Sequence, residues 1–301
     1  MAKKMETKSA RILALILALI MIGSVLVYAF KGSTKVSERE IKFEMGGFAS
    51  NLNYIPYGAQ FVLYLNFKEL DQESELYELV NDVFKSNVDP YTFNHIAFPT
   101  GVGIGSMVIA EYPYPLYFVN INKSKVYFAY EGQEEYKGYK MKLRQGVALV
   151  DQISPFVLGY PTLVYGVIDL INDGKPELSV GKFAYNYTER IYNYTNADFN
   201  YAFIVYDEYA KASVKSNNTS VADFYFSGYR MNGSLYEKVV AIHFTKNGFF
   251  ISPNETKNNT VYYYHQNYDD GLSIAKIGDY NLTKLFKTNP EMRIVEIKYG
   301  K

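Results

Sequence analysis

The sequence predicts an α+β protein, in which an N-terminal transmembrane helix precedes a mostly antiparallel-sheet ectodomain with a few packed helices. Three observations lead to this fold class. The chain begins with a long uncharged apolar run, hairpin signals between alternating apolar segments recur after it, and a few segments have apolar residues at helical spacing. Apolar residues make up 48% of the 301 residues, which is enough for a folded core.

The apolar run covers residues 12–30, nineteen consecutive residues without a charge. At about 1.5 Å per helical residue it would reach roughly 28 Å, close to the hydrocarbon thickness of a bilayer. Four basic residues lie in residues 1–11, against Lys31 and Lys35 just after the run, so the N-terminus is predicted to be cytoplasmic. We therefore expect a single-pass signal-anchor whose partner is membrane lipid, with an extracellular ectodomain at the cell membrane. The alternative is cleavage after Ala29, which would give a secreted protein.

Acceptor sequences for N-glycosylation support an extracellular ectodomain. The 23 asparagines would give about two or three Asn-x-Ser/Thr matches by chance, and nine occur. We therefore expect a glycoprotein with exposed acceptor loops. The candidate sites are Asn122, Asn186, Asn193, Asn217, Asn218, Asn232, Asn254, Asn258 and Asn281.

Beyond the apolar run, the composition predicts a polar tether over residues 31–48 and then two lobes, 49–190 and 191–301, with one lobe left as an alternative. In the first lobe, residues 61–67 alternate as a half-buried strand, and apolar spacing from Leu76 to Phe84 predicts a helix after an Asp71 cap. Pro161 and Gly174 bracket a second helix, and a third is expected over residues 183–191. Further strands are predicted at 156–159, 201–206, 261–266, 273–277 and 292–298, and a last helix at 282–286.

Turn residues predict four hairpins, and three of the four turns contain a glycine. Their turns are residues 122–125, Gln145-Gly146, Asn232-Gly233 and Asn247-Gly248. The strands around them are 116–121 with 126–130, 141–144 with 147–151, 223–231 with 235–245, and 235–245 with 249–252. The second lobe is therefore expected to be rich in hairpins.

Two segments carry a resemblance to a known family. Ile55–Gln60 leads into the strand at 61–67, and FVLGYPTLVYGVIDLINDGKPELS at 156–179 joins a strand, a helix and an acidic-Gly turn. Over about residues 54–208 the chain resembles an uncharacterised family of membrane-anchored extracytoplasmic proteins of the archaeal surface-protein type. The resemblance implies a surface protein and carries no activity or site residue with it.

The sequence gives little support for a catalytic, metal or cofactor site. It has no cysteine, and its histidines, His95, His243 and His265, have no metal-ligand spacing. The glycines of residues 101–105 lack the context of a nucleotide-binding loop, and no G-x-S-x-G motif is present. Lys plus Arg equals Asp plus Glu at 31 each, without a basic block in the ectodomain, so nucleic acid is not an expected partner.

We therefore expect an uncharacterised binding, envelope or interaction protein without a catalytic motif or cofactor. The chain has 31 tyrosines, including the run Tyr262–Tyr264, and exposed tyrosines suit a protein or glycan partner. The alternative is an extracytoplasmic hydrolase with a dispersed Ser/His/Asp or carboxylate site. A cleft that gathers His95 or His265 with an acid and a serine would favour the hydrolase.

Overall fold

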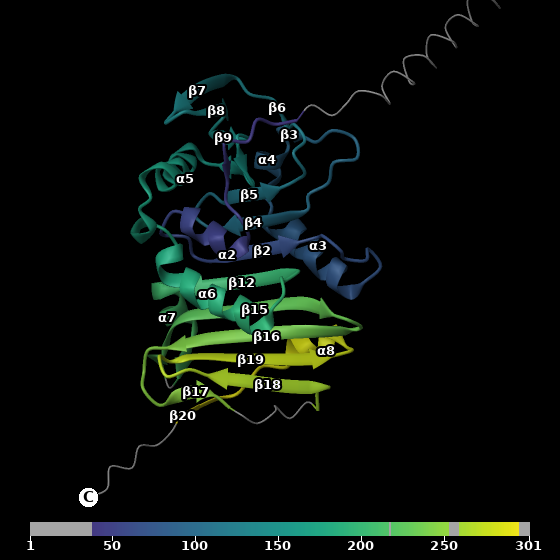
Figure 1. The fold of residues 1–301 in the computed structure, drawn as a ribbon, viewed down its shortest axis with the longest axis vertical. Helices are drawn as coiled ribbons and strands as arrows, with labels where there is room; N and C mark the ends of the chain where they lie inside the picture. The colour runs from purple at the N-terminus through teal and green to yellow at the C-terminus, as the bar shows by residue number, and fades with distance from the viewer. Residues whose placement is uncertain (1–37, 217, 253–258, 295–301) are drawn as a thin grey trace, which may run out of the picture. The chain divides into compact units, whose positions relative to one another are not determined.

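A twelve-stranded antiparallel sheet organises the chain in a computed structural model that describes residues 38–216, 218–252 and 259–294 (Figure 1). Each strand in the sheet pairs antiparallel with its neighbours. The order is β18 (Tyr262–Asn267), β19 (Leu272–Asp279), β16 (Leu235–Phe244), β15 (Ala222–Asn232), β12 (Tyr201–Tyr206), β2 (Val62–Asn66), β4 (Ser106–Ala110), β5 (Leu116–Asn120), β11 (Phe156–Gly159), β9 (Val147–Val150), β8 (Tyr139–Arg144) and β7 (Gly132–Tyr136).

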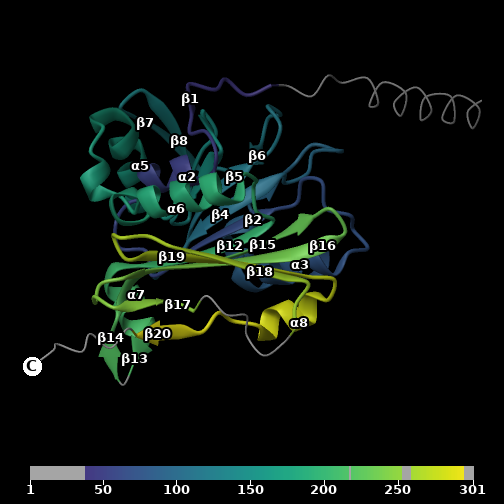
Figure 2. The same cartoon turned by 60° about the horizontal axis from the view of Figure 1, so that its bottom comes forward.

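Helices cover both faces of this sheet (Figure 2). One face carries α2 (Phe48–Asn51), η1 (Leu52–Tyr54), α5 (Pro161–Asp173), η2 (Pro176–Leu178) and α6 (Gly181–Thr195). The other carries α3 (Glu75–Asn87), α4 (Pro90–Phe93) and α8 (Leu282–Lys287), together with α7 (Asp207–Ser213). Because both faces are covered, β2 is buried along all five residues, and the prediction of a half-buried strand at 61–67 is wrong.

Four small strand pairs in the described ranges lie outside the main sheet. They are β1 (Phe43–Glu44) with β10 (Ile153–Ser154), β3 (Ile96–Ala97) with β6 (Tyr127–Phe128), β13 (Lys215–Ser216) with β14 (Thr219–Ser220), and β17 (Phe249–Ile251) with β20 (Met292–Ile294). Within the predicted tether, β1 belongs to one of these pairs, and Met45 and Phe48 are 3% and 4% exposed. Met45 and Phe48 therefore belong to the core, so this part of the predicted tether is not a linker, and residues 31–37 lie outside the described ranges.

The described residues correct the predicted fold class. No helix in the described ranges is long and apolar enough to cross a membrane, and the predicted transmembrane residues 12–30 lie outside those ranges. The two lobes are also not separate, because β2 and β12 hydrogen-bond to each other and join the two halves in one sheet, with Leu65 opposite Tyr201. A single apolar cluster under α6 includes Val62 of the first half and Ile274 of the second. The observed fold is mostly antiparallel sheet with few helices.

Local signals predicted several elements correctly. α5 begins with Pro161 and ends at Gly174, whose φ of 60° lies in the left-handed region that glycine favours. Gln145 and Gly146, with φ of 44° and 82°, form the tight turn between β8 and β9. α3 begins after Ser74, whose Oγ accepts a hydrogen bond from the amide of Tyr77, and not after Asp71 as predicted.

Long-range pairing overturns two of the predicted hairpins. The strand before residues 122–125 is β5, which pairs with β4 and β11, whereas β6 after the turn pairs with β3. The strand after Asn247-Gly248 is β17, which pairs with β20 and not with β16. The hairpin of β15 and β16 does form, with Asn232 opposite Leu235 and a loop at Gly233-Ser234, one residue later than predicted.

Candidate functional site

The side of α6 that faces β16, β19 and β18 forms the candidate site. The helix buries one stripe of residues at helical spacing against the sheet, namely Gly181, Ala184, Thr188, Ile191 and Thr195, and it ends at Asn196 with a left-handed φ of 50°. Tyr187, Arg190 and Tyr194 lie at i, i+3 and i+7 on the flank next to those strands. We call these three side chains and their partners on the sheet, His243, Tyr264, Tyr268, Asp270 and Lys276, the α6 seam.

His243 of β16 lies at the first contact of the seam. The ring of Tyr187 stacks on it, with ring centroids 4.5 Å apart. His243 Nδ1 is 2.5 Å from Asp223 Oδ1, and Nε2 is 2.9 Å from the carbonyl oxygen of Asp270. A carbonyl and a carboxylate accept hydrogen bonds, so this arrangement favours the ring with a proton on both nitrogens. The hydrogen bond with Asp223 is the main cause that raises the pKa of His243, against the opposing effect of burial.

Arg190 makes the second contact, between the helix and the turn after β18. Its guanidinium forms a two-nitrogen ion pair with Asp270 and lies 4.1 Å from the ring centroid of Tyr268. The hydrogen bonds from Arg190 are the first cause that lowers the pKa of Asp270. The left-handed φ of 92° at Gly271 allows the tight turn that places this carboxylate.

Lys276 of β19 makes the third contact. Its ammonium lies 5.3 Å from the ring centroid of Tyr194 and 5.6 Å from that of Tyr264. Tyr264 is 56% exposed, and its ring centroid is 5.3 Å from that of Tyr262 on the same edge strand. The seam therefore presents an aromatic and cationic surface whose side chains hold one another in place.

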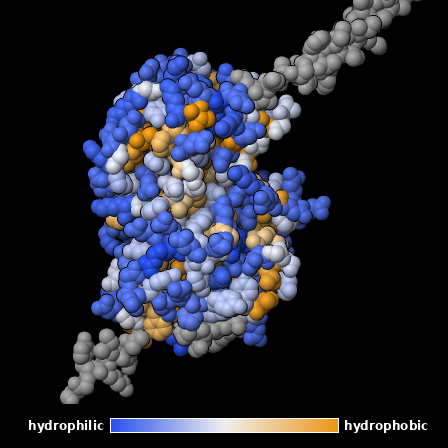
Figure 3. Space-filling view, in the orientation of Figure 1, coloured by the Kyte–Doolittle hydropathy of each residue, from blue (hydrophilic) through white to orange (hydrophobic). Residues whose placement is uncertain are grey.

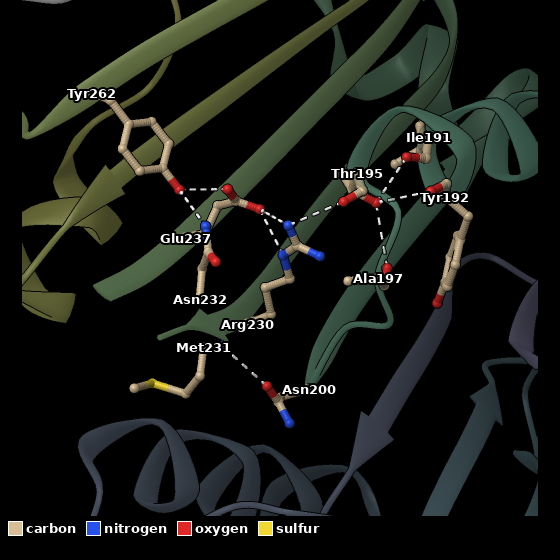
Figure 4. A network of polar contacts seen from close by, with 10 residues as sticks. All are labelled: Ile191, Tyr192, Thr195, Ala197, Asn200, Arg230, Met231, Asn232, Glu237 and Tyr262. Carbon is tan, nitrogen blue, oxygen red and sulfur yellow. Dashed lines mark hydrogen bonds and ion pairs between the residues drawn. The ribbon is translucent and has the colours of Figure 1, made fainter. Parts of the chain in front are cut away.

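A buried polar network fixes the C-terminal end of α6 (Figure 4). Arg230 Nε donates to Glu237 Oε1 at 2.6 Å, and Nη2 donates to the carbonyl of Thr195 at 3.3 Å, at the helix end that attracts cations. The hydroxyl of Tyr262 donates to the other oxygen of Glu237. The network thus ties α6, β15, β16 and the edge strand β18 together at one end of the seam.

A hollow of about 520 Å³ lies beside the N-terminal half of α6. Its lining residues are Lys182, Phe183, Asn186, Tyr187, Glu189, Arg190, Asp223 and Asp270. The surface on this side of the molecule is largely hydrophilic (Figure 3). Cations and carboxylates line the hollow together, so it suits polar groups better than an apolar ligand.

The structure brings none of the sequence-predicted hydrolase residues together. His95 packs against the edge of Tyr91, and His265 stacks on Tyr263. The described residues hold no group of three or more His, Cys, Asp or Glu side chains placed to bind a metal ion. The histidine that does have an acidic partner is His243, and both of its ring nitrogens are occupied by hydrogen bonds.

Sequence reasoning did not find the α6 seam. The spacing of Tyr187, Arg190 and Tyr194 on one helix flank was the available signal, but their partners on β16 and β19 lie 50 or more residues away along the chain. Asp270, likewise distant in the sequence, forms an ion pair with Arg190 in the folded chain.

The predicted glycosylation sites that the structure describes all lie at the surface. The side chains of Asn122, Asn186, Asn193, Asn218, Asn232 and Asn281 are exposed, whereas only seven of the other 14 described asparagines are. Asn217, Asn254 and Asn258 lie outside the described residues. Accessibility therefore permits a glycan on each of the six described sites in the folded chain.

The fold and the seam define a mostly antiparallel-sheet protein with a fixed aromatic and charged surface. An uncharacterized protein of Archaeoglobus fulgidus is 38% identical over 308 residues, which cover 100% of this chain and 98% of that protein. The chain belongs to the same uncharacterised family, as the resemblance predicted; membrane anchoring stays a prediction. Residues 44–172 match the AF_2048_N model, described as a family N-terminal domain, and they include the seven strands on the β2 side of the sheet.

Solved structures with a similar path of the chain include two crystal forms of TP0453. Form I has a TM-score of 0.39 and 8% identity and covers 75% of this chain and 91% of that one. Form IV has a TM-score of 0.36 and 7% identity and covers 79% and 96%. These scores are too low to assign a shared fold.

Proposed function

We propose that this protein is an extracytoplasmic binding protein, attached to the cell membrane through its N-terminal segment, that engages a protein or glycan partner through the α6 seam. The observation that carries this proposal is the arrangement of Tyr194, Lys276 and Tyr264, in which the exposed ring of Tyr264 and the partly exposed Lys276 and Tyr194 are held in place before a partner arrives. Rings fixed in this way bury area on binding at a small cost in side-chain entropy.

Two further observations support the location. The uncharged run at residues 12–30 follows four basic residues, which is typical of a segment that exports the chain behind it. The six described acceptor asparagines are exposed, as glycan-bearing residues must be. A binding role fits better than hydrolysis, because both ring nitrogens of His243 are already hydrogen-bonded to Asp223 and to the carbonyl of Asp270.

Protease treatment of intact cells tests the location. We expect the protease to remove most of the chain from intact cells, and full protection would rule out an extracytoplasmic body. A cytoplasmic protein must stay intact in the same sample, as a control for lysis.

Binding to isolated cell envelopes tests the seam. Purified full-length protein should bind envelopes from cells that lack it, and Tyr264→Ala should lower this binding by about tenfold, as loss of one well-packed aromatic contact does. Tyr127→Ala is the matched control, since Tyr127 is also 56% exposed and lies on β6 in the other half of the chain. Equal loss in both variants would contradict a role of the seam.

A further inference from the structure

The sequon Asn186-Tyr187-Thr188 lies in the middle of α6, where the helix separates its two essential residues. Successive helical residues turn by about 100°, so residues two apart point about 200° away from each other. Asn186 is accordingly exposed, and Thr188 is fully buried against the sheet. An enzyme that reads the asparagine and the hydroxyl residue together cannot reach both in the folded helix.

The hydroxyl of Thr188 makes no stabilising contact in the described part of the protein. Its Oγ1 is buried and has no hydrogen-bond partner there. Thr195, the hydroxyl residue of the next sequon on α6, differs, because its Oγ1 donates to the carbonyl of Ile191 at 3.0 Å. Valine has nearly the same shape as threonine and would fill this apolar site without burying an unpaired hydroxyl. The hydroxyl at position 188 is therefore explained by the sequon and not by the fold.

We propose that Asn186 is N-glycosylated, and that this modification takes place before α6 packs on the sheet. The proposal rests on the extracytoplasmic location proposed above. The donor is a lipid-phosphate-linked oligosaccharide. A bond forms between Asn186 Nδ2 and the anomeric carbon of the donor sugar, and the bond from that carbon to the phosphate oxygen breaks. The lipid phosphate leaves, and the proton lost by the amide nitrogen goes to it.

The folded chain has room for this glycan. Asn186 lines the hollow of about 520 Å³ beside α6, together with Lys182 and Arg190. The first sugar would start at the wall of this hollow, where hydroxyl groups meet charged side chains. Folding would then protect the site from modification in any chain that reached its native state without a glycan.

Site-resolved mass spectrometry of the full-length protein, purified from the membranes of its own host, tests whether Asn186 is modified. We expect a glycan on Asn186 in the wild type and in Thr188→Ser, and at least about tenfold lower occupancy in Thr188→Val and Asn186→Gln. Thr188→Val should keep the thermal unfolding midpoint of the non-glycosylated protein at or above that of the wild type. A lower midpoint would show that the hydroxyl has a structural role and would overturn the proposal.

The order of folding and modification needs a second measurement. Full-length protein without glycans is incubated with host membranes and the lipid-linked donor, either folded or after denaturation. Asn232 is the internal control, because Asn232, Gly233 and Ser234 are all exposed at a hairpin tip. We expect Asn232 to be modified in both samples and Asn186 only in the denatured one. Modification of Asn186 in the folded sample would overturn the order.

Two results with the native protein separate this proposal from the proposed location. A glycan on Asn232 without one on Asn186 would overturn the proposal and leave the extracytoplasmic location supported. Absence of any glycan would also overturn it, while protease treatment of intact cells would decide the location independently.

Discussion

Arg230 and Glu237 lie directly opposite each other on β15 and β16, with Nε 2.6 Å from Oε1, and both side chains are almost completely buried. The guanidinium also reaches the last turn of α6, and the carboxylate also accepts the hydroxyl of Tyr262 from the edge strand. One charge pair therefore connects a helix and three strands. Its strength depends on both partners, since each charge lies in a site that water does not reach.

Arg230→Met should destabilise the protein by about 3–5 kcal/mol, because it leaves the Glu237 carboxylate buried without a counter-charge. The double variant Arg230→Met/Glu237→Leu should recover most of this loss, as hydrophobic replacement of a buried pair often does. Urea unfolding of both variants measures the difference in the free energy of unfolding. If the double variant is as unstable as the single one, the pair stabilises the fold through its geometry and not through charge compensation.

The His243–Asp223 contact should make stability fall as the pH rises. The raised pKa of His243 means that the folded state holds its proton more tightly than the unfolded chain, whose histidine has a pKa of about 6.5. The contribution is fully present below pH 6.5 and is lost as the pH rises through the folded pKa. Asp270 also acts on the ring, and its lowered pKa keeps it ionised in this range.

Asp223→Asn is the matched variant for this effect. It retains a side-chain oxygen of similar shape but removes the negative charge, so the unfolding midpoint should fall less between pH 6 and pH 8 than in the wild type. Thermal unfolding followed by circular dichroism at closely spaced pH values measures this. A parallel pH dependence in the two proteins would show that His243 is not an imidazolium in the folded state.

Elements with local signals were predictable from the sequence, and the pairing between distant elements was not. Pro161 and Gly174 define α5 by their own backbone preferences, and Gln145-Gly146 defines its hairpin in the same way. The β2–β12 pair depends on residues more than 130 positions apart, and β17 takes a distant partner in place of the adjacent strand β16. Hydrophobic patterns show that such strands are buried but do not show which neighbour they pair with.

The same limit explains why the α6 seam was missed. The spacing of Tyr187, Arg190 and Tyr194 on α6 is visible in the sequence. The role of each side chain depends on a partner from the sheet, such as Lys276 for Tyr194.

Lys238 should change the stability with pH in the opposite direction from His243. Burial lowers its pKa to about 8, although its ammonium donates to the carbonyl of Thr288 at 2.8 Å and to Asn289 Oδ1 at 2.8 Å. Between pH 8 and pH 10.5 the unfolded chain holds a proton that the folded state has released, so this lysine favours the folded state increasingly as the pH rises.

Lys238→Met tests this sign. The variant loses the contacts of the ammonium with the end of α8 and also the cost of burying a charge, so its stability relative to the wild type should be highest at neutral pH and should decline by roughly 1.5 kcal/mol between pH 8 and pH 9.5. Urea unfolding at fixed ionic strength measures this decline. A difference between the two proteins that stays constant over this range would mean that Lys238 remains charged.

Asp198 connects the two halves of the sheet, and its removal tests whether they unfold together. Its carboxylate accepts hydrogen bonds from the hydroxyl of Tyr64 and the amide of Asn66 in β2, and from the hydroxyl of Tyr192 in α6. Asp198→Ala leaves the hydroxyls of Tyr64 and Tyr192 without this partner, which should cost about 1–3 kcal/mol. Because β2 and β12 belong to one sheet and one core, the loss should shift a single unfolding transition to lower temperature. Calorimetry distinguishes this from two independent lobes, which would unfold in two transitions with Asp198→Ala separating them further.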